Sequence, residues 1–518
     1  MLEAYPGGCQ GGTGVNAKSV CGNGLSNFRR LSLLTICRSR RLTTKDDGRS
    51  RTTADLLVER GRESDSLRCR RAGKNDRRYV LISPGGRMIA RMLMVSIALL
   101  IPGGPTVAAE WPQFRGAGGR GVTEETDLPH TWDAETNIVW KSELPGPGSS
   151  SPIVVGSKVF LTCYSGYGLT KEQPGNEDDL KLQVVCLDRD TGKIQWSKVV
   201  SPAQPEVSFR SYLTLHGYAS STPVSDGNRV YVFFGKSGVH AFDLDGEPLW
   251  RASAGSSTHG FGTAASPILY KDLLIVSASI ESESLVAFNK NDGKQVWAAK
   301  GIYGGYGTPL LVSLPDGRSE VVVSDGGQMG AGGGSVRAYD PQTGELRWTC
   351  QGLKSPNPYV CASLIAHEGI VYAVGGHTTM AIRAGGKGDV TESHLIWTMK
   401  GGSKVSSPVY HQGHLYWTDR EGILTCVTAD KGTQIYSRSR LDPQSGPIYA
   451  SALLGDGKLY FVSRDMGTYV VEANPQLNQL AHNRIKDDAS VFNGSMAVSD
   501  RRLLLRSDRY LYCIGKKK

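Results

Sequence analysis

The chain of 518 residues lacks the patterns that mark several common protein classes. It has no Cys-x-x-Cys pair, no two adjacent cysteines, no zinc-ligand spacing and no Gly-x-Ser-x-Gly nucleophile elbow. Its one sustained apolar run, about ten residues from Met92 to Ile101, is too short to span a bilayer. Composition also excludes collagen-like, coiled-coil and multi-span membrane proteins. No short motif therefore identifies a reaction or a metal site.

Net charge is distributed unevenly along the chain. Residues 1–87 contain 18 Lys+Arg and 8 Asp+Glu, which accounts for the whole formal charge of +10, whereas residues 88–518 contain 41 of each. A basic chain often binds nucleic acid, but the neutral body of this one predicts no nucleic-acid partner. Residues 1–87 are poor in aromatics and have no hydrophobic period, so we interpret them as a basic N-terminal extension that is either disordered or mis-called.

Residues 88–109 have the order of a secretory signal peptide. The positive segment 88–91 precedes the apolar run, and a Pro-Gly breaker and small residues ending at Ala109 follow it. Because such a signal is read at an N-terminus, we expect translation to start at Met88 or Met92. No Cys lies near Glu110, which follows the predicted cleavage site. The sequence thus predicts a soluble periplasmic or extracellular protein of residues 110–518, with neither a lipid-anchor Cys nor a transmembrane span.

A unit of one small residue, Pro and two or three apolar residues recurs along the body of the chain. Full copies begin at Ser151, Thr222, Ser266, Thr308 and Ser407, and copies without Pro begin at Ser363, Ser451 and Ser495. Most successive copies lie 42 to 44 residues apart, and we interpret two longer steps as insertions. A fixed period of this length indicates a repeat architecture.

A second unit follows the first and usually ends on tryptophan. The segment from Cys186 to Trp196 matches the segment from Ala338 to Trp348 position by position, and similar units end at Trp250, Trp297 and Trp397. We interpret the unit as a hairpin in which Asp caps the turn, Gly supplies a positive φ and Trp lies on the returning strand. Each repeat then holds about four strands in about 44 residues, the size of a propeller blade.

The number of units also predicts how the ring closes. Eight first units occur, but the last repeat ends at Cys513 without a Trp strand, whereas a strand around Trp140 precedes the first unit. We expect this N-terminal strand to pair into the last blade and remove the exposed sheet edges. The predicted fold is therefore an all-β, eight-bladed β-propeller.

The cysteines of the body are expected to be structural. Cys186, Cys426 and Cys513 fall at a repeat position where other repeats carry Ala, as a small buried residue would. Because export implies an oxidising compartment, two disulfides are conceivable. Cys350 could pair with Cys361 across a Pro-containing loop, or Cys163 with Cys186 across neighbouring strands.

The Ala-x-Asp-x-x-Thr-Gly-x-x-x-Trp pattern of residues 338–348 resembles the tryptophan-docking motif of the pyrroloquinoline quinone (PQQ) repeat superfamily, and the likeness extends over residues 111–514. That superfamily includes eight-bladed quinoprotein alcohol dehydrogenases and the non-catalytic lipoprotein of the outer-membrane β-barrel assembly machinery. Residues 110–116 and 385–391 resemble exported proteins of planctomycetes and related bacteria. The resemblance implies that the tryptophans pack between blades, namely Trp140, Trp196, Trp250, Trp297, Trp348 and Trp397.

The resemblance does not transfer an activity. Quinoprotein dehydrogenases are expected to carry an adjacent Cys–Cys disulfide over the quinone, and some carry a haem-attachment motif, but this chain has neither. The assembly lipoprotein is anchored through a Cys at its cleavage site, which is also missing here.

A ligand site in a propeller usually forms where the loops that enter the innermost strands meet at the central channel. Here those loops combine Gly with aromatic and polar residues, and the candidates are His216, Tyr218, His259, Phe261, Tyr303, Tyr306, Tyr359, Lys404, Tyr449 and Asn493. Such a ring could stack a planar ligand, hold a peptide or plug the channel. His216 and His259 are the best acid–base or metal candidates because successive blades would place them side by side, with Arg210 and Lys404 as anion partners. No catalytic residue or metal ligand is assigned.

The sequence is compatible with three functions. The favoured hypothesis is an exported, non-catalytic propeller that binds or scaffolds a cell-envelope protein or peptide without a cofactor. The first alternative is a PQQ- and Ca²⁺-dependent alcohol or sugar dehydrogenase, which needs a carboxylate near the axis; the entry loops contain none, although Glu206 lies upstream. The second alternative is a carbohydrate-binding or hydrolytic propeller, which needs paired carboxylates about 5–10 Å apart.

Overall fold

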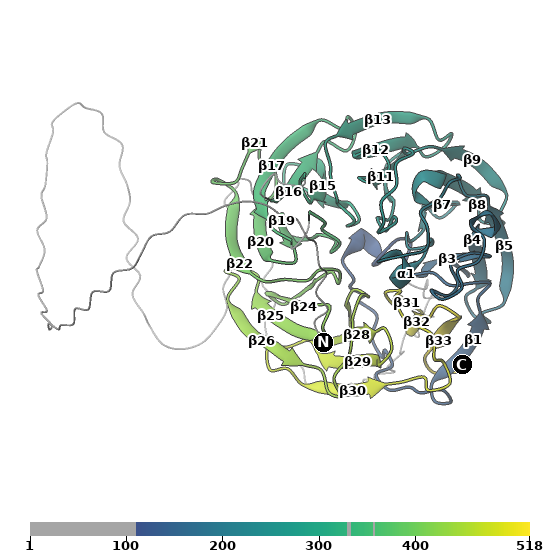
Figure 1. The fold of residues 1–518 in the computed structure, drawn as a ribbon. Helices are drawn as coiled ribbons and strands as arrows, with labels where there is room; N and C mark the ends of the chain where they lie inside the picture. The colour runs from purple at the N-terminus through teal and green to yellow at the C-terminus, as the bar shows by residue number, and fades with distance from the viewer. Residues whose placement is uncertain (1–109, 329–332, 356–357, 518) are drawn as a thin grey trace, which may run out of the picture. The chain divides into compact units, whose positions relative to one another are not determined.

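The computed structural model describes residues 110–328, 333–355 and 358–517. The predicted extension (1–87) and signal peptide (88–109) lie outside these residues. The described residues form eight sheets arranged in a ring, each built from four antiparallel strands, and one of them has a fifth, parallel strand (Figure 1). The predicted all-β, eight-bladed propeller is confirmed.

Strands follow one another outward through each blade in chain order, so that β5, β9 and β13 lie on the circumference (Figure 1). The first blade contains β2 (Ile153–Val155), β3 (Lys158–Ser165), β4 (Lys181–Asp188) and β5 (Ile194–Val200). The second contains β6 (Val224–Ser225), β7 (Arg229–Phe233), β8 (Val239–Asp243) and β9 (Pro248–Ala252). The third contains β10 (Ile268–Tyr270), β11 (Leu273–Ala278), β12 (Ser284–Asn289) and β13 (Gln295–Lys300). The fourth and fifth contain β14 (Leu310–Ser313), β15 (Ser319–Asp325), β16 (Gly334–Tyr339) and β17 (Leu346–Leu353); and β18 (Ile365–His367), β19 (Ile370–Val374), β20 (Thr378–Arg383) and β22 (Leu395–Lys400). The last three contain β23 (Val409–His411), β24 (His414–Thr418), β25 (Ile423–Thr428) and β26 (Gln434–Arg440); β27 (Leu453–Gly455), β28 (Lys458–Ser463), β29 (Gly467–Glu472) and β30 (Gln479–Asn483); and β31 (Ala497–Ser499), β32 (Arg502–Arg506) and β33 (Tyr510–Ile514).

Helical segments are short. They are the helix α1 (Leu213–His216) and the 3-10 turns η1 (Ala117–Gly119), η2 (Glu177–Asp179) and η3 (Gly235–Ser237). No helix within the described part of the chain is long and apolar enough to cross a membrane.

The hydrophobic core lies between neighbouring blades. Every residue of β11 is buried, because both of its faces pack against other sheets, whereas most side chains of β13 on the circumference are exposed and Trp297 is its one buried residue. Tyr231 and Phe233 of β7 pack with Leu274 and Val276 of β11 across one such interface. This two-sided burial explains why the inner strands are nearly continuous apolar runs rather than alternating patterns.

The N-terminal strand β1 (Ile138–Glu143) closes the ring as predicted. It pairs antiparallel with β33 of the last blade, with Trp140 opposite Cys513, and forms the outermost strand of the order β1-β33-β32-β31. Strands from the two ends of the propeller thus share one sheet, which leaves no open blade edge at the junction.

The recurring tryptophan docks onto the turn of the following blade. The Trp140 ring lies so close to Gly192 that a methyl group on this glycine would come within 2.4 Å of it, and the indole N–H donates to the Arg189 carbonyl oxygen at 3.0 Å. The same stacking joins Trp196 to Gly246, Trp250 to Gly293, Trp297 to Gly344 and Trp397 to Gly432. Their indole N–H groups donate to the carbonyl oxygens of Leu244, Lys290, Pro341 and Ala429, respectively.

Trp348 departs from this pattern. Its indole is fully buried, but its N–H donates to Glu320 Oε2 at 2.9 Å rather than to a turn carbonyl. The next blade carries a longer connection in place of the Asp-Thr-Gly turn, and part of it, β21 (Gly388–Asp389), adds a fifth, parallel strand beside Trp348. The altered turn therefore removes the usual carbonyl acceptor, and a buried carboxylate replaces it.

Neither of the disulfides considered from the sequence forms. The six cysteines of the described residues are all free thiols. Cys163 pairs in register with Gln183, and Cys186 with Phe160, so the two cysteines are offset by three positions along the strands. Cys350 lies on the outer strand β17, whereas Cys361 lines the central cavity. Cys186, Cys426 and Cys513 are buried opposite Trp196, Tyr436 and Trp140, which explains the requirement for a small side chain.

Candidate functional site

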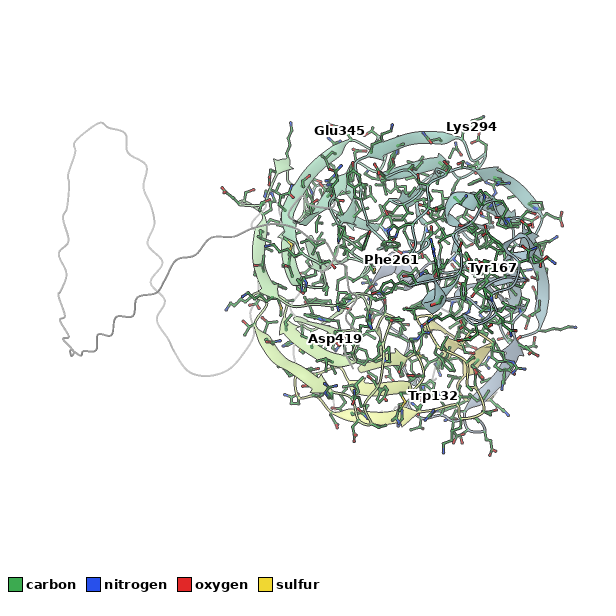
Figure 2. All side chains as sticks on the ribbon, in the orientation of Figure 1. Trp132, Tyr167, Phe261, Lys294, Glu345 and Asp419 are labelled. Atoms are coloured by element: carbon green, nitrogen blue, oxygen red, sulfur yellow. The ribbon has the colours of Figure 1, made fainter. Side chains whose placement is uncertain are left out.

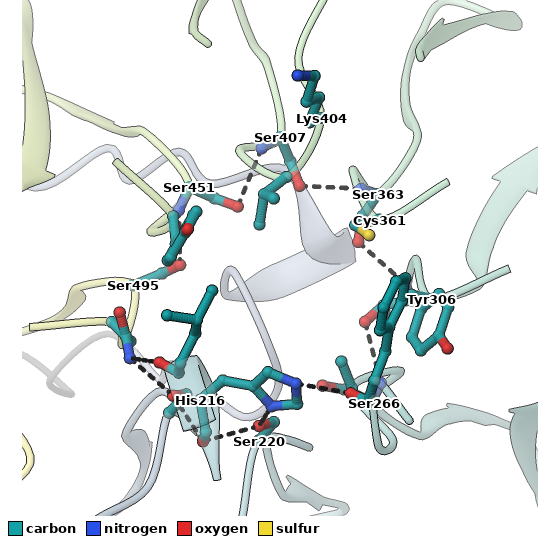
Figure 3. A pocket seen from close by; sticks show the side chains of 18 of the residues that line it. His216, Ser220, Ser266, Tyr306, Cys361, Ser363, Lys404, Ser407, Ser451 and Ser495 are labelled. Atoms are coloured by element: carbon teal, nitrogen blue, oxygen red, sulfur yellow. Dashed lines mark hydrogen bonds between the residues drawn. The ribbon is translucent and has the colours of Figure 1, made fainter. Parts of the chain in front are cut away.

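A central cavity of about 300 Å³ lies where the loops that enter the innermost strands meet (Figure 3). Its lining includes seven of the ten predicted residues: His216, Phe261, Tyr306, Tyr359, Lys404, Tyr449 and Asn493. Tyr212 and Arg420 also line it and were not predicted. Tyr212 precedes His216 in the same entry loop and could have been found there, whereas Arg420 comes from the hairpin between β24 and β25, outside the loops considered.

Eight buried hydroxyls of the described chain form a closed hydrogen-bonded ring around the axis. The backbone N–H of Ser151 donates to Thr222 Oγ1 at 2.9 Å, and the pattern continues blade by blade through Ser266, Thr308, Ser363, Ser407, Ser451 and Ser495 (Figure 3). The Ser495 N–H donates to Ser151 Oγ at 3.0 Å and completes the ring. Each hydroxyl belongs to the first residue of a repeat unit, which explains why this position requires a small side chain with an acceptor oxygen.

A segment that precedes the first blade, residues 111–123, lies against the inner strands. The backbones of Trp111 and Val154 in β2 exchange hydrogen bonds of 3.1 and 2.9 Å. At the other end of the segment, the Leu454 N–H in β27 donates to the Gly121 carbonyl oxygen at 2.8 Å. The first and seventh blades therefore hold the two ends.

Between these ends the segment crosses the channel. The Ser225 N–H in the second blade donates to the Pro112 carbonyl oxygen at 2.9 Å, and Arg115 Nη2 donates to the Pro408 carbonyl oxygen in the sixth blade. The second and sixth blades face each other in a ring of eight, so residues 112–115 pass across the axis. Phe114 lines the cavity from this side. The cavity is thus blind, closed by residues 111–123 and open toward the entry loops.

His216 lies in the cavity wall with both ring nitrogens engaged. Nε2 lies 2.7 Å from the Phe261 carbonyl oxygen and must carry the proton, so Nδ1 accepts from the Ser220 hydroxyl at 2.6 Å. Burial lowers the pKa of His216, which keeps the imidazole neutral at pH 7. Ser220 Oγ also lies 3.2 Å from the His216 carbonyl oxygen, so the pair ties together the turn that follows α1.

His259 lies behind the cavity wall. Its Nδ1 lies 2.9 Å from the Tyr306 hydroxyl and its Nε2 lies 3.0 Å from the Tyr359 hydroxyl. The Phe261 ring packs edge-on against His259 with centroids 4.8 Å apart. Within the described residues the two histidines form no hydrogen bond to each other, because Phe261 lies between them. Both histidines instead contact Phe261, His216 through the Phe261 carbonyl oxygen and His259 through the ring.

Three further candidates lie away from the cavity lining. Tyr218 donates its hydroxyl to the Val207 carbonyl oxygen at 2.6 Å and packs against Tyr164. Tyr303 is half-buried, and its backbone N–H donates to Asp325 Oδ1 at 2.8 Å. Arg210 is exposed. Tyr218 and Tyr303 therefore support the loops rather than line the cavity.

Polar side chains continue the cavity wall beside Leu215 and His216. Asn493 donates to the Leu215 carbonyl oxygen at 2.7 Å and accepts from Arg464 Nη1 at 2.8 Å. The Arg464 guanidinium lies 5.3 Å from the centre of the Tyr449 ring. Lys404 is exposed, and its side chain extends away from the centre of the cavity (Figure 3).

A separate small pocket contains two carboxylates. Glu206 and Glu281 line it together with His259 and Thr263, and its volume of about 30 Å³ suits one water molecule. Burial raises the pKa of Glu281 to about 7, and burial also raises that of Glu206. Thr263 donates its hydroxyl to Glu281 Oε1, whereas Glu281 Oε2 has no hydrogen-bond partner in the described part of the chain.

The cavity does not suit calcium-assisted quinone chemistry. Ca²⁺ in proteins is held by carboxylate and carbonyl oxygens, but no Asp or Glu is among the described residues that line the cavity. The amide of Asn493 is already occupied by hydrogen bonds. Across residues 110–517, apart from the two short gaps, no group of three or more His, Cys, Asp or Glu side chains is placed to hold a metal ion.

A family model, a relative and solved structures with the same fold match this chain. A family model described as the outer membrane protein assembly factor BamB matches residues 114–216, 181–438 and 332–506. The outer membrane protein assembly factor BamB of Burkholderia pseudomallei (strain K96243) is 24% identical over 379 residues, which cover 71% of this chain and 84% of that protein. The crystal structure of BamB from Moraxella catarrhalis has a TM-score of 0.51 at 12% identity and covers 73% of this chain and 97% of that one. A europium-containing methanol dehydrogenase reaches a TM-score of 0.44 at 11% identity over 79% of this chain and 98% of that one, a likeness too weak for any conclusion about activity.

Proposed function

The chain belongs to the family described as the outer membrane protein assembly factor BamB, and we propose that it is an exported, non-catalytic propeller that binds a cell-envelope protein or peptide during the assembly of outer-membrane proteins. The observation that carries this proposal is the extent of the family match. The matched segments together run from residue 114 to residue 506, through all eight blades. The alignment with the relative of that name spans 84% of the relative's length.

The chemistry of the cavity supports a binding role over a catalytic one. A general base must be free to take a proton from a substrate, but His216 and His259 use both ring nitrogens within the protein. No carboxylate among the described residues lines the cavity. We therefore propose that the protein works without quinone or Ca²⁺, and that it does not act as a glycosidase, since Glu206 and Glu281 lie in a pocket too small for a sugar.

The open end of the cavity is the proposed docking face. Residues 111–123 close the other end, so a peptide or a protruding loop can enter only past the entry loops. Tyr212 is 45% exposed in one of these loops, and exposed Tyr is enriched at protein interfaces. Phe261 lies near the axis, whereas Lys294 and Glu345 lie on the circumference (Figure 2). The face that carries Tyr212 and Lys404 is thus available to a partner.

A depletion experiment in the organism that carries the gene tests this function. Loss of the full chain is expected to lower the amount of folded outer-membrane β-barrel proteins, measured by heat-modifiable migration in gels. Re-expression of the wild-type chain or of Lys294→Ala should restore it, and Tyr212→Ala should restore it less well. Unchanged levels of folded barrel proteins after depletion would contradict the assembly role.

A further inference from the structure

The ring of eight hydroxyls supplies unused hydrogen-bond donors to the central cavity. Each ring hydroxyl oxygen accepts a backbone N–H, and none of the eight donates its own proton to another residue of the described chain. A hydroxyl that accepts through its oxygen retains a proton to donate. All ring residues except Thr222 line the cavity (Figure 3). The cavity therefore has a belt of donors around the propeller axis.

The formal charges in the described lining of the cavity are positive. They belong to Lys404 and Arg420, and within the described chain neither side chain makes an ion pair or a hydrogen bond. Asp419 and Glu421 flank Arg420 in its hairpin, but neither of them lines the cavity. A cleft lined by charge of one sign attracts ligands of the opposite sign. The lining thus favours an anionic group over a cationic one.

Four rings from successive entry loops form an aromatic wall on one side of the cavity. Tyr212 packs edge-on against Phe261 with ring centroids 4.5 Å apart, and Phe261 packs edge-on against Tyr359 at 4.9 Å. Tyr306 lies 5.9 Å from Tyr359 in the same manner. An apolar group that is buried against such rings gains hydrophobic and packing energy. A matching ligand therefore combines an anionic group with an apolar body.

The shape of the cavity suits the end of a chain rather than a loop. Residues 111–123 close one end, and Phe114 lines the cavity from that side. The volume of about 300 Å³ is at the lower limit for a pocket that holds a small ligand. A loop must enter and leave through the single opening as two strands, which lie about 5 Å apart when they pair, whereas a chain end enters as one strand. A terminal carboxylate offers about four lone-pair sites to donors, while a terminal ammonium has no acceptor and carries the wrong charge.

We propose that the cavity binds the C-terminal residue of the partner polypeptide, an apolar residue whose free carboxylate accepts hydrogen bonds from the ring hydroxyls. The side chain of this residue packs against the aromatic wall, and the residues before it leave through the open end past Tyr212. Lys404 and Arg420 supply the positive potential that attracts the carboxylate. The inference rests on the proposed function, because it identifies which part of the partner enters the propeller.

Fluorescence anisotropy with short peptides tests the role of the carboxylate. The probe is a Gly- and Ser-containing peptide that ends in leucine and carries a dye at its N-terminus, and it is titrated with the full chain. We expect saturable binding of the free acid and at least about tenfold weaker binding of the same peptide with a C-terminal carboxamide, because hydrogen bonds to a charged acceptor are lost. Equal binding of the acid and the carboxamide, or no binding of either, would overturn the inference.

Two ring variants separate binding from folding. Ser451→Ala removes the acceptor of the Ser407 N–H, and Thr222→Val removes the acceptor of the Ser151 N–H, so both weaken the ring in the same way. Of the two hydroxyls, only that of Ser451 belongs to a residue that lines the cavity. Ser451→Ala is expected to weaken binding of the free acid several-fold, whereas Thr222→Val should bind it as wild type does. Equal weakening in both variants would mean that the ring acts only through the fold, against the inference.

A pair of arginine variants tests the charge. Arg420→Met is expected to weaken binding of the free acid and to reduce its dependence on salt, because one attracting charge is removed. Arg251→Met, at an exposed position on β9, is the control and should change neither. The same affinity and salt dependence in Arg420→Met as in wild type would contradict the inference. If Ser451→Ala fails to fold, the arginine variants and the two peptides still decide.

Competition with N-acetyl-leucine distinguishes a chain end from a small free acid. It is expected to displace the peptide at least about tenfold more weakly than the unlabelled peptide does, because it lacks the residues that pass the opening. Equally strong displacement would indicate a site for a small acid and overturn the inference. Lower levels of folded barrel proteins after depletion, without any preference for the free acid, would contradict only this inference. A preference for the free acid with unchanged barrel proteins would support the inference and contradict only the assembly role.

Discussion

The backbone N–H of Ser495 donates to the Ser151 hydroxyl oxygen at 3.0 Å across 344 residues of chain. This bond joins the last blade to the first at the axis, as the pairing of β1 with β33 joins them at the circumference. The propeller is therefore closed twice, once by a hydroxyl and once by a strand. The same hydroxyl position is repeated in all eight blades, which makes it the most regular feature of the sequence as well as of the structure.

Ser151→Ala is expected to destabilise the fold by about 1–2 kcal/mol, because it leaves the buried Ser495 N–H without an acceptor. Urea unfolding of the full chain measures the change in free energy. Ser201→Ala, at an exposed position, serves as the control and should have almost no effect. Equal stability of the two variants would mean that the ring contributes nothing to closure.

Gly293→Ala is expected to be more destabilising than Gly413→Ala. Both glycines have a positive φ, +72° and +79°, so both substitutions carry the same backbone strain of about 1 kcal/mol. Only at Gly293 does the added methyl group meet the Trp250 ring, at 2.5 Å, whereas nothing lies within 4 Å of it at Gly413. The difference between the two variants in urea unfolding thus isolates the docking of tryptophan onto the neighbouring turn.

If the two glycine variants lose the same free energy of unfolding, the tight contact between Trp250 and Gly293 contributes nothing. In that case the constant spacing between Gly and Trp within the Trp unit of each repeat reflects only the hairpin geometry. The prediction is a clear excess loss for Gly293→Ala.

The propeller, its blade number and its closure by the Trp140 strand could all be predicted, because each follows from the number and spacing of the repeat units. Because the Ser-Pro unit and the Trp unit recur, a local irregularity in one copy does not hide the strand order that the copies share. The exception at Trp348 could not be predicted, since it arises in the neighbouring blade, where β21 replaces the usual turn. A repeat therefore predicts what its members share and not what one insertion changes.

The candidate site was predictable only in outline. Seven entry-loop residues reach the cavity because loop position alone brings them there. Sequence could not show that His216 and His259 are each held by hydrogen bonds from other loops, because these partners lie up to 100 residues away. Nor could it show that residues 111–123 cross the channel, since a segment that occurs once carries no periodic signal.

Glu281→Gln is expected to remove a pH dependence of stability. Burial raises the pKa of Glu281 from 4.5 to about 7 in the folded protein, so the stability present below about pH 4.5 is lost as the pH rises toward 7. The loss amounts to about 3 kcal/mol. Glutamine stays neutral, so the variant should unfold at a higher urea concentration than wild type at pH 8 and at a similar one at pH 5.

Glu172→Gln, at an exposed position, is the matched control for this comparison and should leave the pH profile unchanged. A profile of Glu281→Gln that parallels that of wild type between pH 5 and pH 8 would show that the carboxyl is not held neutral by its surroundings.

Calcium is expected to have no effect on quinone binding. No described carboxylate lines the cavity, so Ca²⁺ lacks its preferred ligands beside the quinone. Titration of the full chain with pyrroloquinoline quinone, with and without Ca²⁺ and followed by tryptophan fluorescence, measures this. Saturable micromolar binding near one equivalent that requires Ca²⁺ would revive the dehydrogenase alternative.

Site-specific photo-crosslinking in living cells tests the central claim, partner binding at the open end of the propeller, most directly. A crosslinking amino acid is placed at Tyr212, on the face of the entry loops, and in a second strain at Lys294, on the circumference. The account predicts a discrete adduct with an outer-membrane assembly component at Tyr212 and none at Lys294. Adducts of equal strength at both positions, or none at Tyr212 while the protein is folded and exported, would contradict it.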